Sequence, residues 1–430
     1  MSVTVSIILL ILSLSGCMIL KIDLVWGLLA GMFAFMAAAV HMGYSLKDVM
    51  RMMGRGIRES FIVVGVLLII GAMTGIWRGS GTVQLLVYYG TRLIHPRVFI
   101  LSAFLLPMAV SYLIGTSFGT AASVGVVMMM LCRVSGGNAV LTAGAVMSGI
   151  FFGDRASPAS SCAHLNAYLT GTEIYSNVKR MLKDCIPAVA VTMGLYGILS
   201  VMNAPESVDT QIVNVLREEY RLSAVLLLPA LVILAAPLIR MGIRRAMGIS
   251  ILCASVCAVV MQGMSVADLL KTLVLGYEAE GELGVMLNGG GVKSMFHGCI
   301  MILISATYSG IFNGTNMLSG AETFLEKHTA RFPLFTVTAV TGIPLIMFSC
   351  NQTLALMLHV PLISPLYRER GISREQMMLD VSNTTVLFSA LVPWCLACSM
   401  PLEILGVGPE CVPWAFFLYL PAIVSFFRKR

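Results

Sequence analysis

The sequence predicts an all-α polytopic membrane protein, made of two inverted repeats of about five to six membrane helices each, with broken or re-entrant helices at the midplane. Of its 430 residues, 58% are apolar and 11% are charged, whereas soluble domains carry about 25% charged residues. Apolar windows of roughly 20 residues recur along the whole chain, and each can cross the hydrocarbon as a helix. Similar segments in the two halves and polar clusters inside apolar windows complete the prediction.

The first apolar window covers residues 3–20. No lysine or arginine precedes it, although the first region of a secretory signal needs such charges. Further apolar windows follow directly. We therefore expect a retained first membrane helix.

Segments of the first half recur in the second half at one spacing. "GIWRGSGT" at 75–82 resembles "GIFNGTNM" at 310–317, and "IPAVAV" at 186–191 resembles "LPAIVS" at 420–425. Both pairs are separated by roughly 235 residues, and unrelated matches would not share a spacing. We expect a first repeat over 1–203, a polar extracytoplasmic linker over 204–221 and a second repeat over 222–430.

Loop charges predict that the two repeats cross the membrane in opposite senses. Residues 43–59 hold four basic and two acidic side chains, whereas the similar segment 263–280 holds three acidic side chains and one lysine. Lysine and arginine favour the cytoplasmic side, which places the first segment inside and the second outside. The same rule predicts a multi-pass protein of the bacterial inner membrane with both termini in the cytoplasm.

Four clusters of small polar residues interrupt the apolar windows, two in each half. They lie at 114–120, 153–161, 348–353 and 380–394. Glycine and proline allow or force a helix to break, and broken helices inside a membrane line cavities. The alternative is close helix packing, which also uses small residues. The expected break positions are Gly115, Gly119, Gly153, Pro158, Gly289, Gly290 and Pro393.

The polar side chains of these clusters are the candidate substrate or ion contacts. Their hydroxyl and amide oxygens, with freed carbonyls, suit Na⁺, and freed backbone N–H groups suit an anion. The candidates are Thr116, Ser117, Thr120, Ser157, Ser160, Ser161, Asn351, Gln352, Ser382, Asn383, Thr384 and Thr385.

Asp154 is the candidate carboxylate of the site. An acid at membrane depth is costly and marks a functional position by default, although a local salt bridge with the adjacent Arg155 would also explain it. His164 is either a proton relay or a polar capping group.

Other function classes fit less well. "GTSFG" at 115–119 matches the G-x-S-x-G nucleophile motif, but that motif needs a strand–turn–helix context. We therefore expect a transporter and no enzyme. The net charge of +7 sits in short loops, where it sets orientation, so the expected partner is the lipid bilayer and not nucleic acid. We expect no metal or organic cofactor.

The sequence resembles the NhaC family of sodium/proton antiporters along nearly its whole length. The resemblance rests on "GTSFGT" at 115–120, "SGIFFGDRASPAS" at 148–160, "NGGGVKSM" at 288–295 and "LFSALVPW" at 387–394. It implies a helical ion-transporter fold with inverted repeats and broken central helices, and a secondary transporter with Na⁺, H⁺ or both as coupling ions.

Several acidic positions of that family are neutral in this chain. Ser161 and Asn351 stand where family members usually carry aspartate, and "SNTT" at 382–385 replaces a Glu-Asp-Ser-Gly pattern. Asp154 remains. A carboxylate can hold either Na⁺ or H⁺, whereas asparagine and serine do not titrate. The resemblance therefore favours Na⁺/H⁺ antiport, and a Na⁺- or H⁺-coupled carrier or exchanger of a small organic acid, such as malate or lactate, or of an amino acid stays open. A homodimer is also left open.

Overall fold

The structure is a computed structural model that describes residues 3–20, 22–204, 219–236, 239, 241–279, 288–315 and 332–428. Within these ranges the fold is all-α, as predicted, and the single β-bridge joins Tyr277 to Gly289. Residues 205–218, which are most of the predicted linker, lie outside the described ranges, as do the stretches 280–287 and 316–331 and the last two residues.

The first half contains ten helices in the described ranges. They are α1 Val3–Ile19, α2 Leu24–His41, α3 Leu46–Gly79, α4 Thr82–Leu93, α5 Phe99–Ile114, α6 Ser117–Thr120, α7 Val126–Val134, α8 Ala139–Ala156, α9 Ser161–Thr170 and α10 Ile174–Met202, with a 3-10 turn η1 at Pro96–Val98 and a π-helical turn η2 at Ala121–Gly125. The helix expected at 3–20 is α1, and its retention stays a prediction.

The second half is also helical in the described ranges, and its helices are broken more often. Its described elements are η3 Ala224–Leu227, α12 Leu228–Ala235, α13 Ile243–Val260, α14 Val266–Leu275, α16 Gly291–Ser294, α17 Phe296–Thr315, α19 Leu334–Ser349, α20 Gln352–Glu369, α21 Arg374–Val381, the π-helical turn η5 Ser382–Val386, α22 Leu396–Leu405, η6 Pro409–Trp414, η7 Phe416–Leu418 and α23 Leu420–Phe427.

Four described segments are long and apolar enough to cross a membrane alone. They are Leu24–His41, Pro96–Ile114, Ser117–Val134 and Ile174–Met202. The end of α3 and the start of α4 form a fifth candidate, bent by 70°. Breaks shorten many of the remaining apolar helices, as expected for a polytopic protein with discontinuous spans.

Helix starts in the second half repeat those of the first at one spacing of about 235 residues. The matching first residues are Phe99 and Leu334, Ser117 and Gln352, Ala139 and Arg374, and Ser161 and Leu396. The ends of one matching pair keep the same spacing, because α5 ends at Ile114 and α19 ends at Ser349. That the halves cross the membrane in opposite senses stays a prediction.

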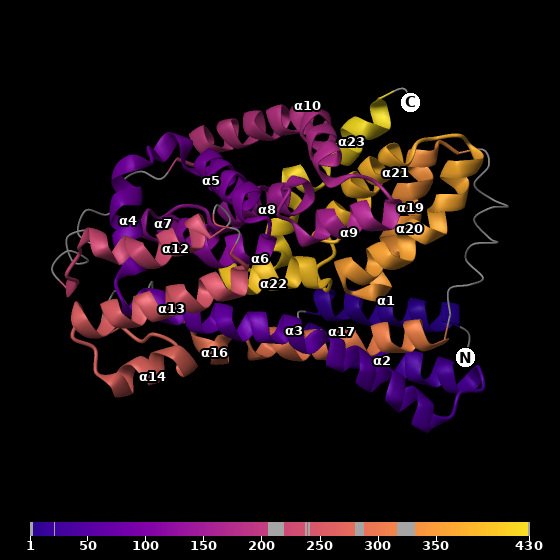
Figure 1. Ribbon diagram of the computed structural model, residues 1–430, viewed down its shortest axis with the longest axis horizontal. Coiled ribbons are helices and arrows are strands. Elements are labelled where there is room, and N and C mark those ends of the chain that lie inside the picture. The colour runs from indigo at the N-terminus through magenta and orange to yellow at the C-terminus, as the bar shows by residue number, and fades with distance from the viewer. Residues whose placement is uncertain are drawn as a thin grey trace.

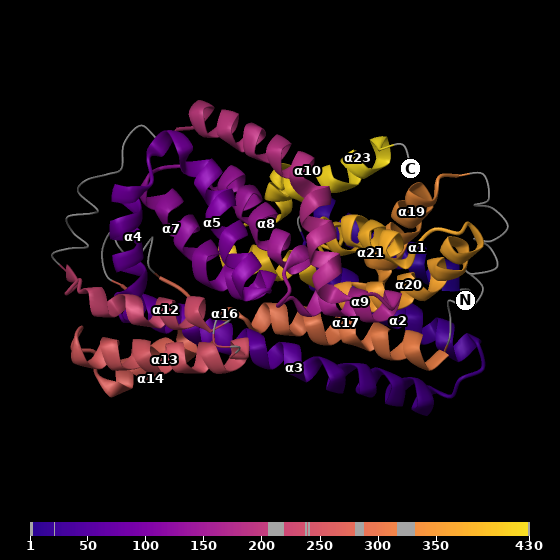
Figure 2. The same cartoon turned by 45° about the horizontal axis from the view of Figure 1, so that its top comes forward.

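The helices form two sides around a packed centre. Helices α3 and α17 run side by side with α2 and α13 along one side of the molecule, and α10 runs along the opposite side (Figures 1 and 2). Gly56 and Gly310 allow the close contact between α3 and α17, because a Cβ at either position would lie 2.0 Å from a backbone oxygen of the other helix.

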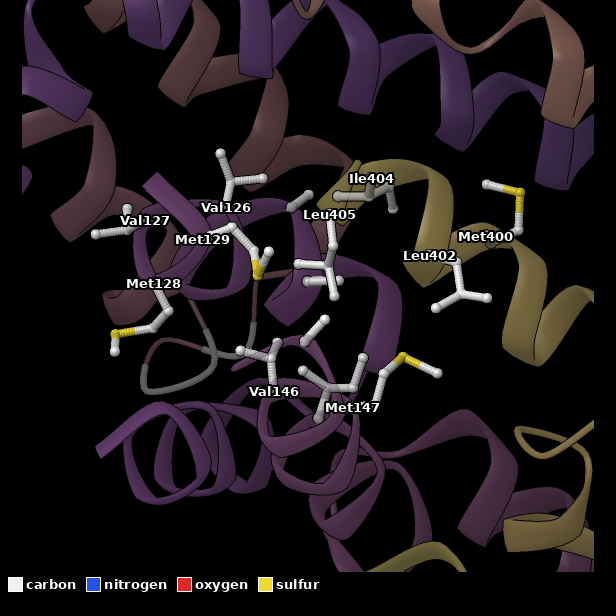
Figure 3. Packing of buried hydrophobic residues seen from close by; sticks show 14 of the residues in the cluster. Val126, Val127, Met128, Met129, Val146, Met147, Met400, Leu402, Ile404 and Leu405 are labelled. Carbon is white, nitrogen blue, oxygen red and sulfur yellow. The ribbon is translucent and has the colours of Figure 1, made fainter. Parts of the chain in front are cut away.

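An apolar core packs α7 and α8 of the first half against α22 of the second half. Figure 3 shows Val126 and Met129 of α7, Val146 and Met147 of α8, and side chains of α22 facing one another. All four named residues are buried. Burial of this kind stabilises by about 25 cal/mol per Å² of apolar area in water; in the bilayer, tight packing holds such helices together.

Two of the predicted clusters form helical hairpins with a broken tip. Between α5 and α6, Gly115 takes a left-handed conformation with φ 75°, and between α19 and α20, Cys350 does the same with φ 54°. Cys350 is the one described non-glycine residue with positive φ, where a Cβ normally clashes. The next residues, Thr116 and Asn351, cap the following helix with their side-chain oxygens.

The other breaks lie close to prolines and glycines. Pro158 lies between α8 and α9, Pro393 lies in the turns at 389–395, and Gly289 and Gly290 precede α16 with φ of 121° and 73°.

Gly119 and Gly153 were expected as break positions, and this is wrong. Gly119 lies inside α6 and Gly153 inside α8. The reason at Gly153 is packing, because a Cβ there would lie 2.1 Å from the carbonyl carbon of Ser111 on α5. The small residue therefore serves close approach of two membrane helices, which was the alternative reading of these clusters.

Candidate functional site

Asp154 lies at the end of α8, where three discontinuous elements meet. Its side chain is buried, with 7% of the residue exposed. Among the described residues, no basic side chain lies within ion-pair distance of its carboxylate. The alternative explanation, a local salt bridge with Arg155, is therefore not seen in the described part of the chain.

Both hairpin tips contact the Asp154 carboxylate. The backbone N–H of Ser117, the first residue of α6, interacts electrostatically with it. The side-chain amide of Gln352, the first residue of α20, donates to Oδ2 at 3.4 Å and to the carbonyl of Val386 at 3.0 Å. Because each contact comes from the first turn of a helix, partial positive charge faces the carboxylate from two directions.

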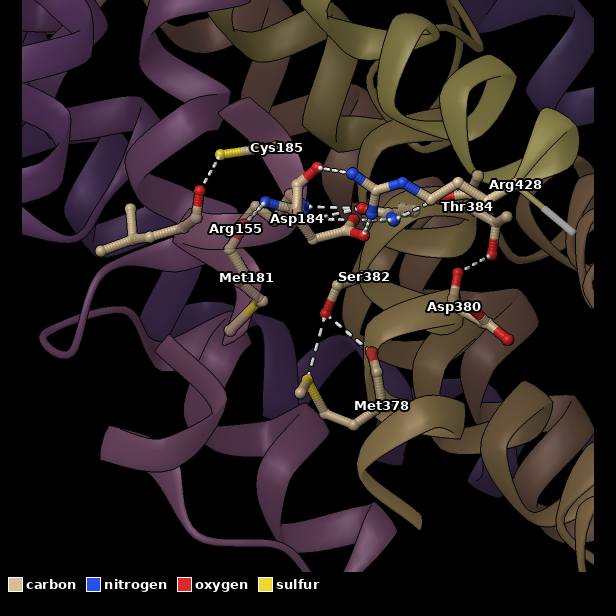
Figure 4. A network of polar contacts seen from close by, with 12 residues as sticks. Arg155, Met181, Asp184, Cys185, Met378, Asp380, Ser382, Thr384 and Arg428 are labelled. Atoms are coloured by element: carbon tan, nitrogen blue, oxygen red, sulfur yellow. Dashed lines mark hydrogen bonds and ion pairs between the residues drawn. The ribbon is translucent and has the colours of Figure 1, made fainter. Parts of the chain in front are cut away.

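Arg155 points into a separate network that joins the halves. Its Nε donates to Oδ1 of Asn383 at 3.0 Å, and Nη2 also contacts that oxygen. Nη2 lies 3.7 Å from Oδ2 of Asp184 on α10. Figure 4 shows Arg155 and Asp184 next to Arg428, whose guanidinium also pairs with Asp184. A buried charge needs partners of this kind. Here Arg155, Arg428 and Asn383 all contact Asp184.

The "SNTT" turn at 382–385 supplies structural contacts. Ser382 donates to the carbonyl of Met378 at 2.9 Å and accepts from Asn166 of the first half, and Thr384 donates to the carbonyl of Asp380 at 2.7 Å. Asn383 donates to Asp184 and Ser425, at 2.8 Å each. The four side chains of residues 382–385 are all buried. The turn therefore ties the repeats together beside Asp154.

Residues 157–160 form the connection between α8 and α9, and residues 161–164 form the first turn of α9. Ser157 donates to the carbonyl of Tyr112 at 2.6 Å, and Ser160 donates to the carbonyl of Asp154 and caps α9. Ser161 and His164 are exposed. Nδ1 of His164 lies 2.8 Å from the carbonyl oxygen of Ser160, and its role as a relay stays a prediction.

Thr116, Thr120 and Asn351 serve the hairpin backbone in this conformation. Oγ1 of Thr116 accepts from the N–H of Gly119 at 3.4 Å, and Thr120 donates to the carbonyl of Thr116 at 2.8 Å. Oδ1 of Asn351 accepts from Thr353 N–H at 2.8 Å. Their part in binding an ion or substrate stays a prediction.

A cavity of about 1070 Å³ opens beside the first hairpin tip and the α8–α9 connection. Gly115 and Thr116 line it from the hairpin, Ser161 lines it from α9, and Arg244 and Arg245 line it from α13. No carboxylate is among its described lining residues. The cavity therefore carries positive charge close to the Asp154 centre.

The structure adds polar groups that sequence reasoning missed. His359 is fully buried, with Nδ1 2.6 Å from Oγ1 of Thr385 and Nε2 2.8 Å from Oγ1 of Thr341. Buried Asp380 accepts from Tyr367 at 2.9 Å. His359 stands inside an apolar stretch of α20, and that placement was the available signal. Asp184 and Asp380 lie in polar stretches of α10 and α21, which gave no such signal.

Comparison with known proteins gives one family across the chain. The sequence model described as "Na+/H+ antiporter family" matches residues 1–167 and 149–427. The chain is 27% identical to the "Malate-2H(+)/Na(+)-lactate antiporter" of Bacillus subtilis, over 95% of this chain and 88% of that protein. It is 25% identical to an "Uncharacterized Na(+)/H(+) antiporter" of Haemophilus influenzae, over 88% and 84%. It is 26% identical to the "Na(+)/H(+) antiporter NhaC" of Alkalihalophilus pseudofirmus, over 86% and 81%.

Proposed function

The chain belongs to the Na⁺/H⁺ antiporter family, and we propose that it exchanges Na⁺ for H⁺ by alternating access at a site centred on Asp154. Family membership makes it a multi-pass membrane transporter. The observation that supports the site is a buried carboxylate that both hairpin tips contact and that has no basic partner among the described residues.

Competition at one carboxylate couples the two ions. A bare carboxylate away from water is costly unless it is paired or protonated. Asp154 therefore holds a proton in one half of the cycle and Na⁺ in the other. Hydroxyl and carbonyl oxygens of the tips complete the Na⁺ shell, because Na⁺ prefers oxygen ligands. Thr116, Ser117 and Gln352 are the nearest candidates by sequence and contact.

Movement of the hairpins would open the site to one side at a time. Gly115 and Cys350 break the two hairpins, and the tips meet Asp154 from opposite halves of the chain. Inverted repeats give alternating access by rocking one element against another around a central site. We place the protein in the bacterial inner membrane with both termini cytoplasmic, from the loop charges.

Proton flux in proteoliposomes tests this function. Purified protein is reconstituted with a pH-sensitive dye inside, and Na⁺, K⁺ or choline is added outside. Exchange predicts that the interior becomes alkaline with Na⁺ and stays unchanged with K⁺ or choline. Absence of Na⁺-dependent flux in vesicles that contain folded protein would contradict Na⁺/H⁺ exchange.

A second candidate is exchange of a small organic acid. The observation that favours it is the positive cavity beside the first hairpin tip, where Arg244 and Arg245 face Thr116 and Ser161 without a lining carboxylate. Such a cavity attracts anions and repels Na⁺. Uptake of labelled lactate and malate into the same vesicles separates the candidates, since only the second predicts accumulation of the acid.

A further inference from the structure

A second, smaller cavity lies away from Asp154, where the end of α3 passes α7, α16 and α22. Its volume is about 170 Å³, which is well above the roughly 15 Å³ that a cavity needs to hold one water. Arg78 of α3 and Arg133 of α7 both line it, with Asn288 and Ser294. The apolar walls come from Met129, Met130, Met295, Ile404 and Leu405.

Arg78 is buried without a carboxylate partner. It is 8% exposed, Nη1 donates to the carbonyl of Thr74 at 2.9 Å, and Nε has no hydrogen-bond partner. No described acid lies within ion-pair distance of it. A guanidinium keeps its charge in proteins, and an unpaired buried charge costs several kcal/mol.

The neighbouring charges increase this cost. Arg133 also lines the cavity, and its Nη2 lies 3.5 Å from the carbonyl of Leu405 and 3.4 Å from that of Gly406. The lining acid is Glu403, whose Oε1 lies 3.1 Å from Nδ1 of His297 on α17. His297 also contacts Asp23 at 3.0 Å. Glu403 also lines the cavity but is paired with His297, and no described carboxylate lies within ion-pair distance of either arginine.

We propose that Arg78 and Arg133 form a binding site for the carboxylate of a small organic acid, separate from the Asp154 site. A carboxylate supplies the missing negative charge and matches the fork of a guanidinium, which it can accept in two hydrogen bonds. Nδ2 of Asn288 can donate to a further oxygen of the acid, since within the described residues only its Oδ1 is used, by the N–H of Ala279. Oγ of Ser294 donates to the carbonyl of Gly291 and can accept from a hydroxyl group of the acid. The methionine and aliphatic walls accommodate its carbon chain.

Glycine makes room for the guanidinium of Arg78. A Cβ at Gly290 would lie 2.7 Å from Nη1 of Arg78 and 2.4 Å from the backbone nitrogen of Gly75. The break at Gly289 and Gly290 therefore brings an irregular backbone against the end of α3, with the arginine facing the cavity. This site uses neither Asp154 nor either hairpin tip, so it does not depend on the proposed exchange mechanism.

Thermal unfolding of the purified full chain in detergent tests the proposal. Potassium lactate and potassium malate are compared with potassium chloride at equal ionic strength. We expect at least one organic acid to raise the unfolding temperature of the wild type and chloride to leave it unchanged. Arg78→Gln abolishes the shift, and Arg133→Gln weakens the apparent affinity about tenfold. Arg97→Gln, at an exposed arginine outside the cavity, keeps the wild-type shift.

Further variants keep the test decisive. If Arg78→Gln does not fold, Arg133→Glu carries the test, because it reverses a charge on an exposed residue and should abolish the shift. Asp154→Asn should keep it. The proposal is overturned if the shift survives both Arg133 variants, if chloride matches the acids, if neither acid shifts unfolding, or if Asp154→Asn removes the shift, which would place the acid at the transport site.

Discussion

Gln352 and Asp154 are 198 residues apart in the chain, and the amide nitrogen of Gln352 lies 3.4 Å from Oδ2 of Asp154. The contact joins the first turn of α20 in the second half to the last turn of α8 in the first. It makes the environment of the carboxylate depend on the position of a hairpin tip. A side chain in this place can link ion binding to hairpin movement.

Gln352→Leu should weaken Na⁺ binding about tenfold. The change removes a polar contact to a charged group, worth about 1.5 kcal/mol at this length, and it removes an amide oxygen that could coordinate Na⁺. The measurement is the Na⁺ concentration for half-maximal proton flux. An unchanged half-maximal concentration would show that the tip of α20 does not contribute to the ion site.

Arg155→Met should destabilise the protein by about 3 kcal/mol. It removes one member of a buried network and leaves Asp184 with an altered charge balance. Asp184→Leu in the same background should recover part of the loss, with a coupling of at least about 1 kcal/mol in a double-mutant cycle. Unfolding in detergent measures both.

The exposed pair of Arg51 and Asp48 provides the control for that cycle. Its atoms lie 3.2 Å apart at the start of α3, and Arg51→Met should change stability by less than about 0.5 kcal/mol. Additive effects of the Arg155 and Asp184 changes would contradict the network.

Gly153→Ala should destabilise by at least about 3 kcal/mol, because the new Cβ would lie 2.1 Å from backbone of α5 and force α5 and α8 apart. Gly194→Ala on α10 is the matched control. No atom lies within 4 Å of a Cβ there, so the helix should gain about 0.5–1 kcal/mol. Equal effects at the two glycines, measured by thermal unfolding, would refute close packing as the role of Gly153.

Much of the hairpin architecture could be predicted from local sequence. Gly115 and Pro158 interrupt apolar windows and mark two breaks, and Asp154 was found because an acid at membrane depth is rare. The role of Gly153 could not be predicted, because a glycine that breaks a helix and one that admits a neighbour look alike until the neighbour is placed. Asp184 was missed because it follows three basic residues in the polar first part of α10, and only the fold brings Arg155 and Asn383 to it.

The orientation of the side chains in the "SNTT" turn also could not be predicted from the sequence. That these side chains are ligands stays a prediction; in this conformation Ser382 and Thr384 bond to backbone carbonyls one turn earlier, and Asn383 joins the Arg155 network. Which way a buried hydroxyl or amide points depends on the π-helical turn and on residues from the other half.

Glu173 should make helix α10 sensitive to acid. The backbone N–H groups of Tyr175 and Ser176 lower the pKa of Glu173 below its ordinary value of 4.5. A lowered pKa means that the charged cap stabilises the fold fully above the ordinary value and that this contribution is lost as pH falls through the lowered value.

Glu173→Gln tests this contribution. The wild type should unfold at a higher temperature than the variant at pH 7, and the difference should vanish in strong acid. A difference that grows as the pH falls would contradict the assigned sign.

The central claim is that one carboxylate, Asp154, holds either Na⁺ or H⁺. Proton release by purified protein on addition of Na⁺ in weak buffer measures this most directly. At a pH at which Asp154 is protonated in the absence of Na⁺, we predict release of about one proton per bound Na⁺ in the wild type and in the control Asp48→Asn, and none in Asp154→Asn. The claim is contradicted if folded Asp154→Asn binds Na⁺ and releases as many protons as the wild type.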